Sequence, residues 1–225
     1  LADTTKLNAT TASTSSTAAS VTATSAAQPA SYALDVSQLA SAQSLVSGSF
    51  ASTSTVVGSG TLTIGIGTPT YNSAPNDKTY ASFSQASTAD ITIAANSTLA
   101  DVRDAINASS ANINASILQS GGSYQLMITG DSTGANQGIS VSVSGDSSGT
   151  DSDNTGLSQL VFNASAQQMS QVKAPTDAAF SLNGLALTSN TNTITDVVDG
   201  LTLTLESTTS SSTNIAVSRD TTAIT

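Results

Sequence analysis

Residues 97–130 constrain the fold of this chain more than any other segment, because they read as a helix, a loop and a tight hairpin. Thr98 can cap the helix N-terminus with its hydroxyl, and Asp101 suits both a capping box and the positive end of the helix dipole. Gly121 and Gly122 tolerate the positive φ of a short hairpin turn. The residues expected to face a core are Leu99, Val102 and Ile106 in the helix, and Ile113, Ala115, Ile117, Tyr124, Leu126 and Ile128 in the hairpin. The segment therefore predicts a helix packed beside a two-stranded ribbon.

Short stretches of alternating apolar and polar residues recur along the rest of the chain, as half-buried strands require. The expected strands lie at residues 32–36, 61–66, 91–93, 139–143, 180–182, 201–205 and 215–217. Residues 69–78 read as a long loop, and residues 193–198 fit a single helical turn capped by Thr193. Residues 1–28 read as loop or edge strand anchored by Leu7. The expected fold class is therefore mainly β with one or two short helices (α+β).

Composition excludes several classes of function. The 38% apolar content of this 225-residue chain supports small cores, so two small β-rich domains fit best. A net charge of -10 repels phosphate backbones and anionic lipid surfaces, so we expect neither nucleic acid nor a membrane as partner. The chain contains no cysteine and no histidine, which removes thiolate chemistry and the commonest general base and metal ligand.

One acidic stretch resembles the first half of a calcium loop. Asp151, Asp153 and Gly156 have the spacing of alternate oxygen ligands and a sharp turn, but the twelfth position is Phe162 instead of Glu. Residues 145–156 are therefore interpreted as a flexible, solvated acidic loop, and no metal site is expected.

Catalytic alternatives are equally weak. Ser132, in a Gly-Asp-Ser sequence, would need a base, and only the lysines at positions 6, 78 and 173 are formally available. Asp101 and Asp104 could form a carboxylate pair, but capping and the neighbouring Arg103 explain them more simply. Arg103 and Arg219 could be interface anchors, because arginine is enriched at interface hot spots. We interpret them instead as exposed or locally paired side chains. We expect no catalytic, cofactor-binding or metal-ligating residues and no cofactor.

Three segments carry a family resemblance. The helix LADVRDAINA, with its Ile106-Asn107 pair before an Ala-rich loop and the Gly-Gly hairpin, resembles the "IN" motif of flagellar filament and hook-associated proteins. Two further stretches narrow the resemblance to the family of flagellar filament cap proteins, also called hook-associated protein 2 or FliD. These are YALDVSQLA at residues 32–40, continuing through Gln43 and Leu45, and FSLNG at 180–184 followed by NTITD at 192–196 and GLTLTL at 200–205.

The resemblance implies one domain built from both ends of the chain with a second domain inserted in it. The expected boundaries are residues 1–47 plus 166–225 for the first head domain and 48–165 for the inserted one, which carries the IN motif. The chain begins without Met and shows no secretory signal, so we expect a piece of a longer protein that lacks the helical legs of the family.

The function that the resemblance implies is structural. Such heads associate with copies of themselves in a ring at the extracellular tip of the bacterial flagellum and promote flagellin polymerisation, so the implied partners are the chain itself and flagellin. The alternative is a surface-exposed adhesin, or a variable domain of a flagellin or junction protein, that binds host ligands such as mucin or glycans. An enzyme is not expected.

Overall fold

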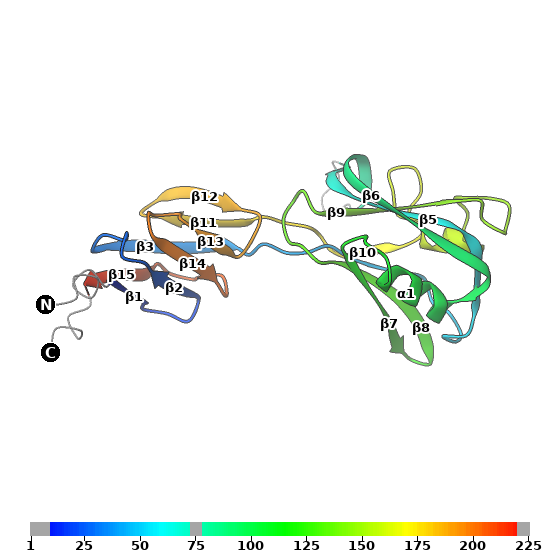
Figure 1. Cartoon of the computed structure of the whole chain (residues 1–225), viewed down its shortest axis with the longest axis horizontal. Coiled ribbons are helices and arrows are strands. Elements are labelled where there is room, and N and C mark those ends of the chain that lie inside the picture. The colour runs from blue at the N-terminus through cyan, green and yellow to red at the C-terminus, as the bar shows by residue number, and fades with distance from the viewer. Residues whose placement is uncertain (1–9, 73–77, 220–225) are drawn as a thin grey trace, which may run out of the picture. The chain divides into compact units, whose positions relative to one another are not determined.

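The computed structural model describes residues 10–72 and 78–219, which form two compact units. Unit 1 combines Leu1–Ala40 with Asp177–Thr225, and unit 2 is the continuous segment Ser41–Thr176 between them (Figure 1). Antiparallel sheets make up most of both units, with one short α-helix among the described residues. The mainly β fold class predicted from the sequence is confirmed.

Two sheets enclose the core of unit 1. Its described strands are β1 (Thr10–Thr14), β2 (Ala19–Ala23), β3 (Ala30–Gln38), β11 (Ala178–Leu182), β12 (Leu185–Ser189), β13 (Thr193–Thr195), β14 (Leu201–Leu205) and β15 (Thr213–Arg219). They form a five-stranded sheet in the order β1-β15-β3-β11-β12 and a three-stranded sheet in the order β13-β14-β2. Alternate residues such as Leu34, Phe180 and Leu203 are buried in one cluster, as period-two strands require.

The strands of unit 1 are paired in a nested way. β1 pairs with β15, β2 pairs with β14, and β3 pairs with both β15 and β11. The three strands that precede unit 2 in the sequence therefore share no ladder with one another. Each is completed by a strand that follows unit 2.

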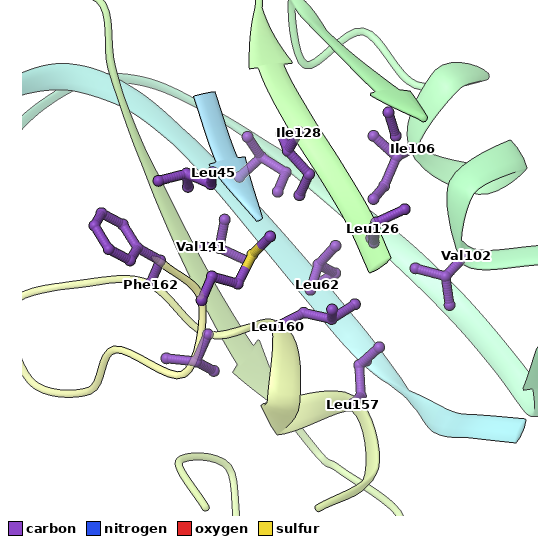
Figure 2. Close-up of a cluster of buried hydrophobic side chains, with 14 of the residues drawn as sticks. Leu45, Leu62, Val102, Ile106, Leu126, Ile128, Val141, Leu157, Leu160 and Phe162 are labelled. Atoms are coloured by element: carbon purple, nitrogen blue, oxygen red, sulfur yellow. The ribbon is translucent and has the colours of Figure 1, made fainter. Parts of the chain in front are cut away.

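Unit 2 is a sandwich of two sheets with the helix at its side. Its described elements are β4 (Ser44–Val46), β5 (Val56–Tyr71), β6 (Tyr80–Thr98), α1 (Leu99–Asn107), β7 (Ile113–Ser120), β8 (Ser123–Gly130), β9 (Gly138–Ser144), the 3-10 helix η2 (Gly156–Leu160) and β10 (Ser170–Lys173). The sheets have the orders β10-β4-β8-β7 and β6-β5-β9. Figure 2 shows side chains from both sheets, α1 and η2 meeting in one core, including Leu62, Ile106, Leu126 and Leu160, each fully buried.

The helix and hairpin predicted from residues 97–130 are confirmed. Thr98 and Asp101 form a complete capping box, because the Asp101 N–H donates to Thr98 Oγ1 at 3.2 Å and the Thr98 N–H donates to Asp101 Oδ2 at 2.9 Å. Gly121 and Gly122 have φ values of 58° and 82° in the turn between β7 and β8. The predicted helix face, Leu99, Val102 and Ile106, is fully buried.

The ribbon that leads into the helix is much longer than predicted. β5 continues through Tyr71, so residues 69–71 of the expected long loop are strand, and residues 73–77 lie outside the described part. β5 tolerates Pro69 because its pairing with β9 ends at Gly67, which leaves that side of the strand without a partner that needs the missing N–H. The expected short strand at residues 91–93 is part of the 19-residue β6.

Two further details differ from the sequence predictions. Residues 193–198 form no helical turn: Thr193–Thr195 is β13, and the Ile194 backbone pairs with Leu203 of β14. The acidic loop at residues 145–156 is organised around a buried carboxylate, which is described below. The predicted anchor Leu7 lies outside the described residues.

The expected division into two head domains stays a prediction, but the compact units divide the chain at slightly different positions. Residues 41–47 and 166–176 belong to unit 2, because β4 pairs with β8 and β10 pairs with β4.

Candidate assembly surfaces

The edges of the sheets are the places where another chain could add a strand, because an edge strand presents unpaired backbone N–H and C=O groups. The edge strands are β1 and β12 in the five-stranded sheet, β13 and β2 in the three-stranded sheet, β10 and β7 in one sheet of unit 2, and β6 and β9 in the other. Natural edges are commonly protected by charge, proline or a covering segment. An edge strand without such protection is a candidate contact surface.

β12 is an unprotected edge of unit 1. Its sequence, LALTS, contains no charge and no proline, and Leu185 is 66% exposed. The turn before it is fixed by Asn183, with φ 50°, and Gly184, with φ 82°, and the Asn183 Oδ1 atom accepts a hydrogen bond from the Ala33 N–H at 2.8 Å. Beside the strand, the outer face of the sheet holds a shallow depression of about 340 Å³ lined mostly by small side chains, among them Ala186. This edge strand is short and carries no charge.

β7 is the corresponding edge of unit 2, and the IN motif closes part of it. Ile106 fills the core, while Asn107 bonds both backbone groups of Ala115: its Oδ1 accepts from the N–H at 2.7 Å and its Nδ2 donates to the C=O at 2.8 Å. The asparagine thus takes the place of a neighbouring strand at that residue. By antiparallel alternation, the backbone groups of Ile117 and Gln119 also point outward from β8. Leu118 of this strand is 43% exposed, and β7 carries no charge.

The charged residues of α1 have the roles of capping and local pairing. Hydrogen bonds from Thr98 hold the pKa of Asp101 below its usual value. Arg103 forms an ion pair with Asp104 at 2.8 Å, and this contact lowers the pKa of Asp104. These carboxylates and Arg103 lie on the exposed side of the helix, which gives no indication of a catalytic pair.

The loop at residues 145–156 contains a carboxylate that the sequence analysis missed. Asp146 is 6% exposed, and its Oδ2 accepts hydrogen bonds from the N–H of the fully buried Ser158, at 2.7 Å, and from the Ser158 hydroxyl. Burial raises the pKa of Asp146, but hydrogen bonds from Ser158, Ser148 and Leu157 together lower it by more. Asp146 therefore stays ionised and ties the loop to η2.

The candidate calcium ligands accept hydrogen bonds from backbone N–H groups of the same loop. Asp151 Oδ1 accepts from the Asp146 N–H at 2.8 Å, and Asp153 Oδ1 accepts from the Thr155 N–H at 3.0 Å. Phe162, at the twelfth position, is buried in the core and its backbone pairs with Val141. In the described ranges, no group of three or more acidic side chains could hold a metal ion.

Among the described residues, the candidate serine also has no base hydrogen-bonded to it. Ser132 is exposed after the end of β8, and Asp131 beside it accepts a hydrogen bond from the Asn114 amide. Within the described part of the chain no hydrogen bond joins Ser132 to Lys78 or Lys173, and Lys6 lies outside that part. A search of the described helices finds none with the length and apolar character to cross a membrane.

Comparison with known proteins matches two segments of the chain to family models. The family model "Flagellar hook-associated protein 2 C-terminus" matches residues 175–225, and "Flagellin hook IN motif" matches residues 61–132. The chain is 37% identical to flagellar hook-associated protein 2 of Escherichia coli strain K12 over 106 residues, covering 46% of this chain and 21% of that protein. It is 34% identical to B-type flagellar hook-associated protein 2 of Pseudomonas aeruginosa over 136 residues, covering 56% of this chain and 28% of that protein. The chain thus spans less than a third of the length of these relatives.

Solved structures match over nearly the whole chain. The D2-D3 domains of the flagellar cap protein FliD from Escherichia coli superpose with a TM-score of 0.76 and 27% identity, covering 95% of this chain and 100% of that structure. The longer D1-D2-D3 structure gives a TM-score of 0.79 and covers 98% of this chain and 58% of that structure. FliD from Pseudomonas aeruginosa PAO1 gives a TM-score of 0.70 at 25% identity.

Proposed function

Because the chain belongs to the flagellar hook-associated protein 2 (FliD) family and comprises its D2-D3 head region, we propose that it forms the head of a filament cap that associates with copies of itself and promotes flagellin polymerisation. The family consists of structural cap proteins, not enzymes, and is found at the extracellular tip of the flagellar filament. Unit 1 and unit 2 are then the two head domains. The observation that carries the proposal is the match between this chain and the complete D2-D3 structure.

The proposed contacts between copies are the neutral edges β7 and β12. The whole chain carries a net charge of -10, so identical copies repel one another except where their surfaces are uncharged. A closed ring needs heterologous contacts, in which one surface meets a different surface of the next copy. β7 and β12 are two separate uncharged edge strands, one in each unit, and so satisfy that requirement.

The test introduces a carboxylate into each edge of the full-length cap protein. Leu185→Asp and Leu118→Asp place a charge at exposed positions, so the fold is preserved while strand addition is blocked. Val56→Asp is the matched control, because Val56 is 56% exposed but lies on β5, which is not an edge strand, at a position that pairs with Thr98.

Light scattering measures the mass of the oligomer. Filament growth is measured in cells that lack their own cap protein and produce the variant. We expect both edge variants to reduce assembly and filament growth, and the control to behave as the parent protein. Normal assembly of both edge variants would contradict the proposal that β7 and β12 form the contacts between copies. Normal filaments in cells with no cap protein at all would contradict the proposed function itself.

A further inference from the structure

The segments by which the chain enters and leaves unit 2 lie side by side. The Ser41 N–H donates to the Thr176 C=O at 2.9 Å, and the Thr176 N–H donates to the Ser41 C=O at 3.1 Å. The two hydroxyl groups are 2.8 Å apart, and the Ser41 hydroxyl also reaches the Ala174 C=O at 2.8 Å. The two ends of unit 2 therefore form a small antiparallel pair.

A buried amide pair lies directly inside that contact. Gln43 is fully buried, Gln171 is 5% exposed, and Gln43 Nε2 donates to Gln171 Oε1 at 2.6 Å. The Tyr71 hydroxyl donates to the same Oε1 atom at 2.9 Å. The Gln171 Oε1 atom thus accepts one hydrogen bond from the opposite connecting segment and another from β5.

The other side of the pair is fixed by the core sheet. Gln43 Oε1 accepts a hydrogen bond from the Ile139 N–H of β9, and it lies 2.8 Å from the hydroxyl of Tyr80, which is 2% exposed. Burial raises the pKa of Tyr80 far above its usual value, so its hydroxyl remains a donor. The cluster therefore joins both connecting segments to strands β5, β6 and β9.

We propose that the Gln43–Gln171 pair is a clasp that holds the two connecting segments of unit 2 against each other and against its core. Buried polar groups are costly when unpaired, so these amides favour one arrangement over all others. A slip of either segment by one residue would turn its glutamine to the opposite face and leave its partners unsatisfied. The β4–β10 pairing is irregular between Gln171 and Lys173, so register there needs such a device. The clasp keeps unit 2 closed at its ends independently of the pairing within unit 1.

Hydrogen exchange of the full chain tests the clasp at the Ser41 and Thr176 amides. In the wild-type chain both should exchange as slowly as core amides such as Leu126 and Val141, since local opening must break the clasp first. Gln171→Leu removes the acceptor at similar volume and should speed exchange at the two end amides by about tenfold or more, because it removes two buried hydrogen bonds.

The control variant is Gln125→Leu, which removes a partly buried amide that donates to the Ser47 C=O at 2.9 Å and should leave the end amides protected. Fast exchange of Ser41 and Thr176 in the wild-type chain would overturn the proposal even if Gln171→Leu does not fold. The proposal would also be overturned if Gln171→Leu increased the exchange rate of the core amides as much as that of the Ser41 and Thr176 amides. Gln171 would then be an ordinary core residue.

Discussion

Replacing Asn107 by alanine tests the structural role of the IN motif. The substitution removes both hydrogen bonds to the backbone of Ala115. Ala115 is only 6% exposed. An ordinary hydrogen bond contributes about 1 kcal/mol net, and a buried group left without a partner costs about 1 to 3 kcal/mol. Because Asn107 itself is exposed, water reaches part of the vacated space, so we expect a loss of about 2 to 3 kcal/mol in the free energy of unfolding of unit 2.

Urea unfolding followed by tyrosine fluorescence measures this loss, because the chain has no tryptophan and three of its four tyrosines, Tyr71, Tyr80 and Tyr124, lie in unit 2. Asn114→Ala is the matched control: its amide bonds only the exposed Asp131, so we expect about 0.5 kcal/mol or less. If Asn107→Ala cost no more than this control, Asn107 would not be acting in place of a neighbouring strand.

Two other substitutions test separate features. Asp146→Asn removes a buried charge whose folded pKa is lowered, so the carboxylate stabilises the fold above its unfolded pKa of about 4 and loses that contribution as the pH falls through the folded value. We expect the wild-type chain to lose more stability than Asp146→Asn between about pH 6 and pH 3 in thermal unfolding, and parallel curves would contradict this assignment. Gly138→Ala would place a Cβ atom 2.6 Å from Pro69 Cδ, which should lower stability by about 1 to 3 kcal/mol. Gly48→Ala, with nothing within 4 Å, is its control and should change little; equal effects would mean that the strands around Pro69 separate without cost.

Local signals explain why one part of the fold could be predicted in detail. The capping box of Thr98 and Asp101 and the turn at Gly121 and Gly122 depend on residues no more than three positions apart, so the sequence contains the whole interaction. The apolar face of α1 follows from helical periodicity in the same way. Exact elements were predicted where the interacting residues are neighbours in the chain.

The failures arise where the deciding partner is remote or the pattern is ambiguous. Three apolar residues within 193–198 fit a helical turn, but pairing of Ile194 with Leu203 makes the segment a strand. Gln43 and Gln171 are 128 positions apart, and neither has a local pattern that indicates burial. Asp146 looked like one more acid in a solvated loop, because its partner Ser158 lies beyond that loop. Buried polar residues that pair across long sequence distances produce no periodic pattern in the sequence.

The nested pairing of unit 1 determines the order in which the chain can fold when it is delivered from its N-terminus. β1, β2 and β3 have no ladder to form when they emerge, because their partners β11, β14 and β15 follow residue 177. Unit 2, in contrast, contains all of its own strand partners and can finish as soon as Thr176 is available. β1, β2 and β3 must therefore stay unpaired until unit 2 has emerged, and joining them to their partners across the whole length of unit 2 is the slow step expected of non-local strand pairing.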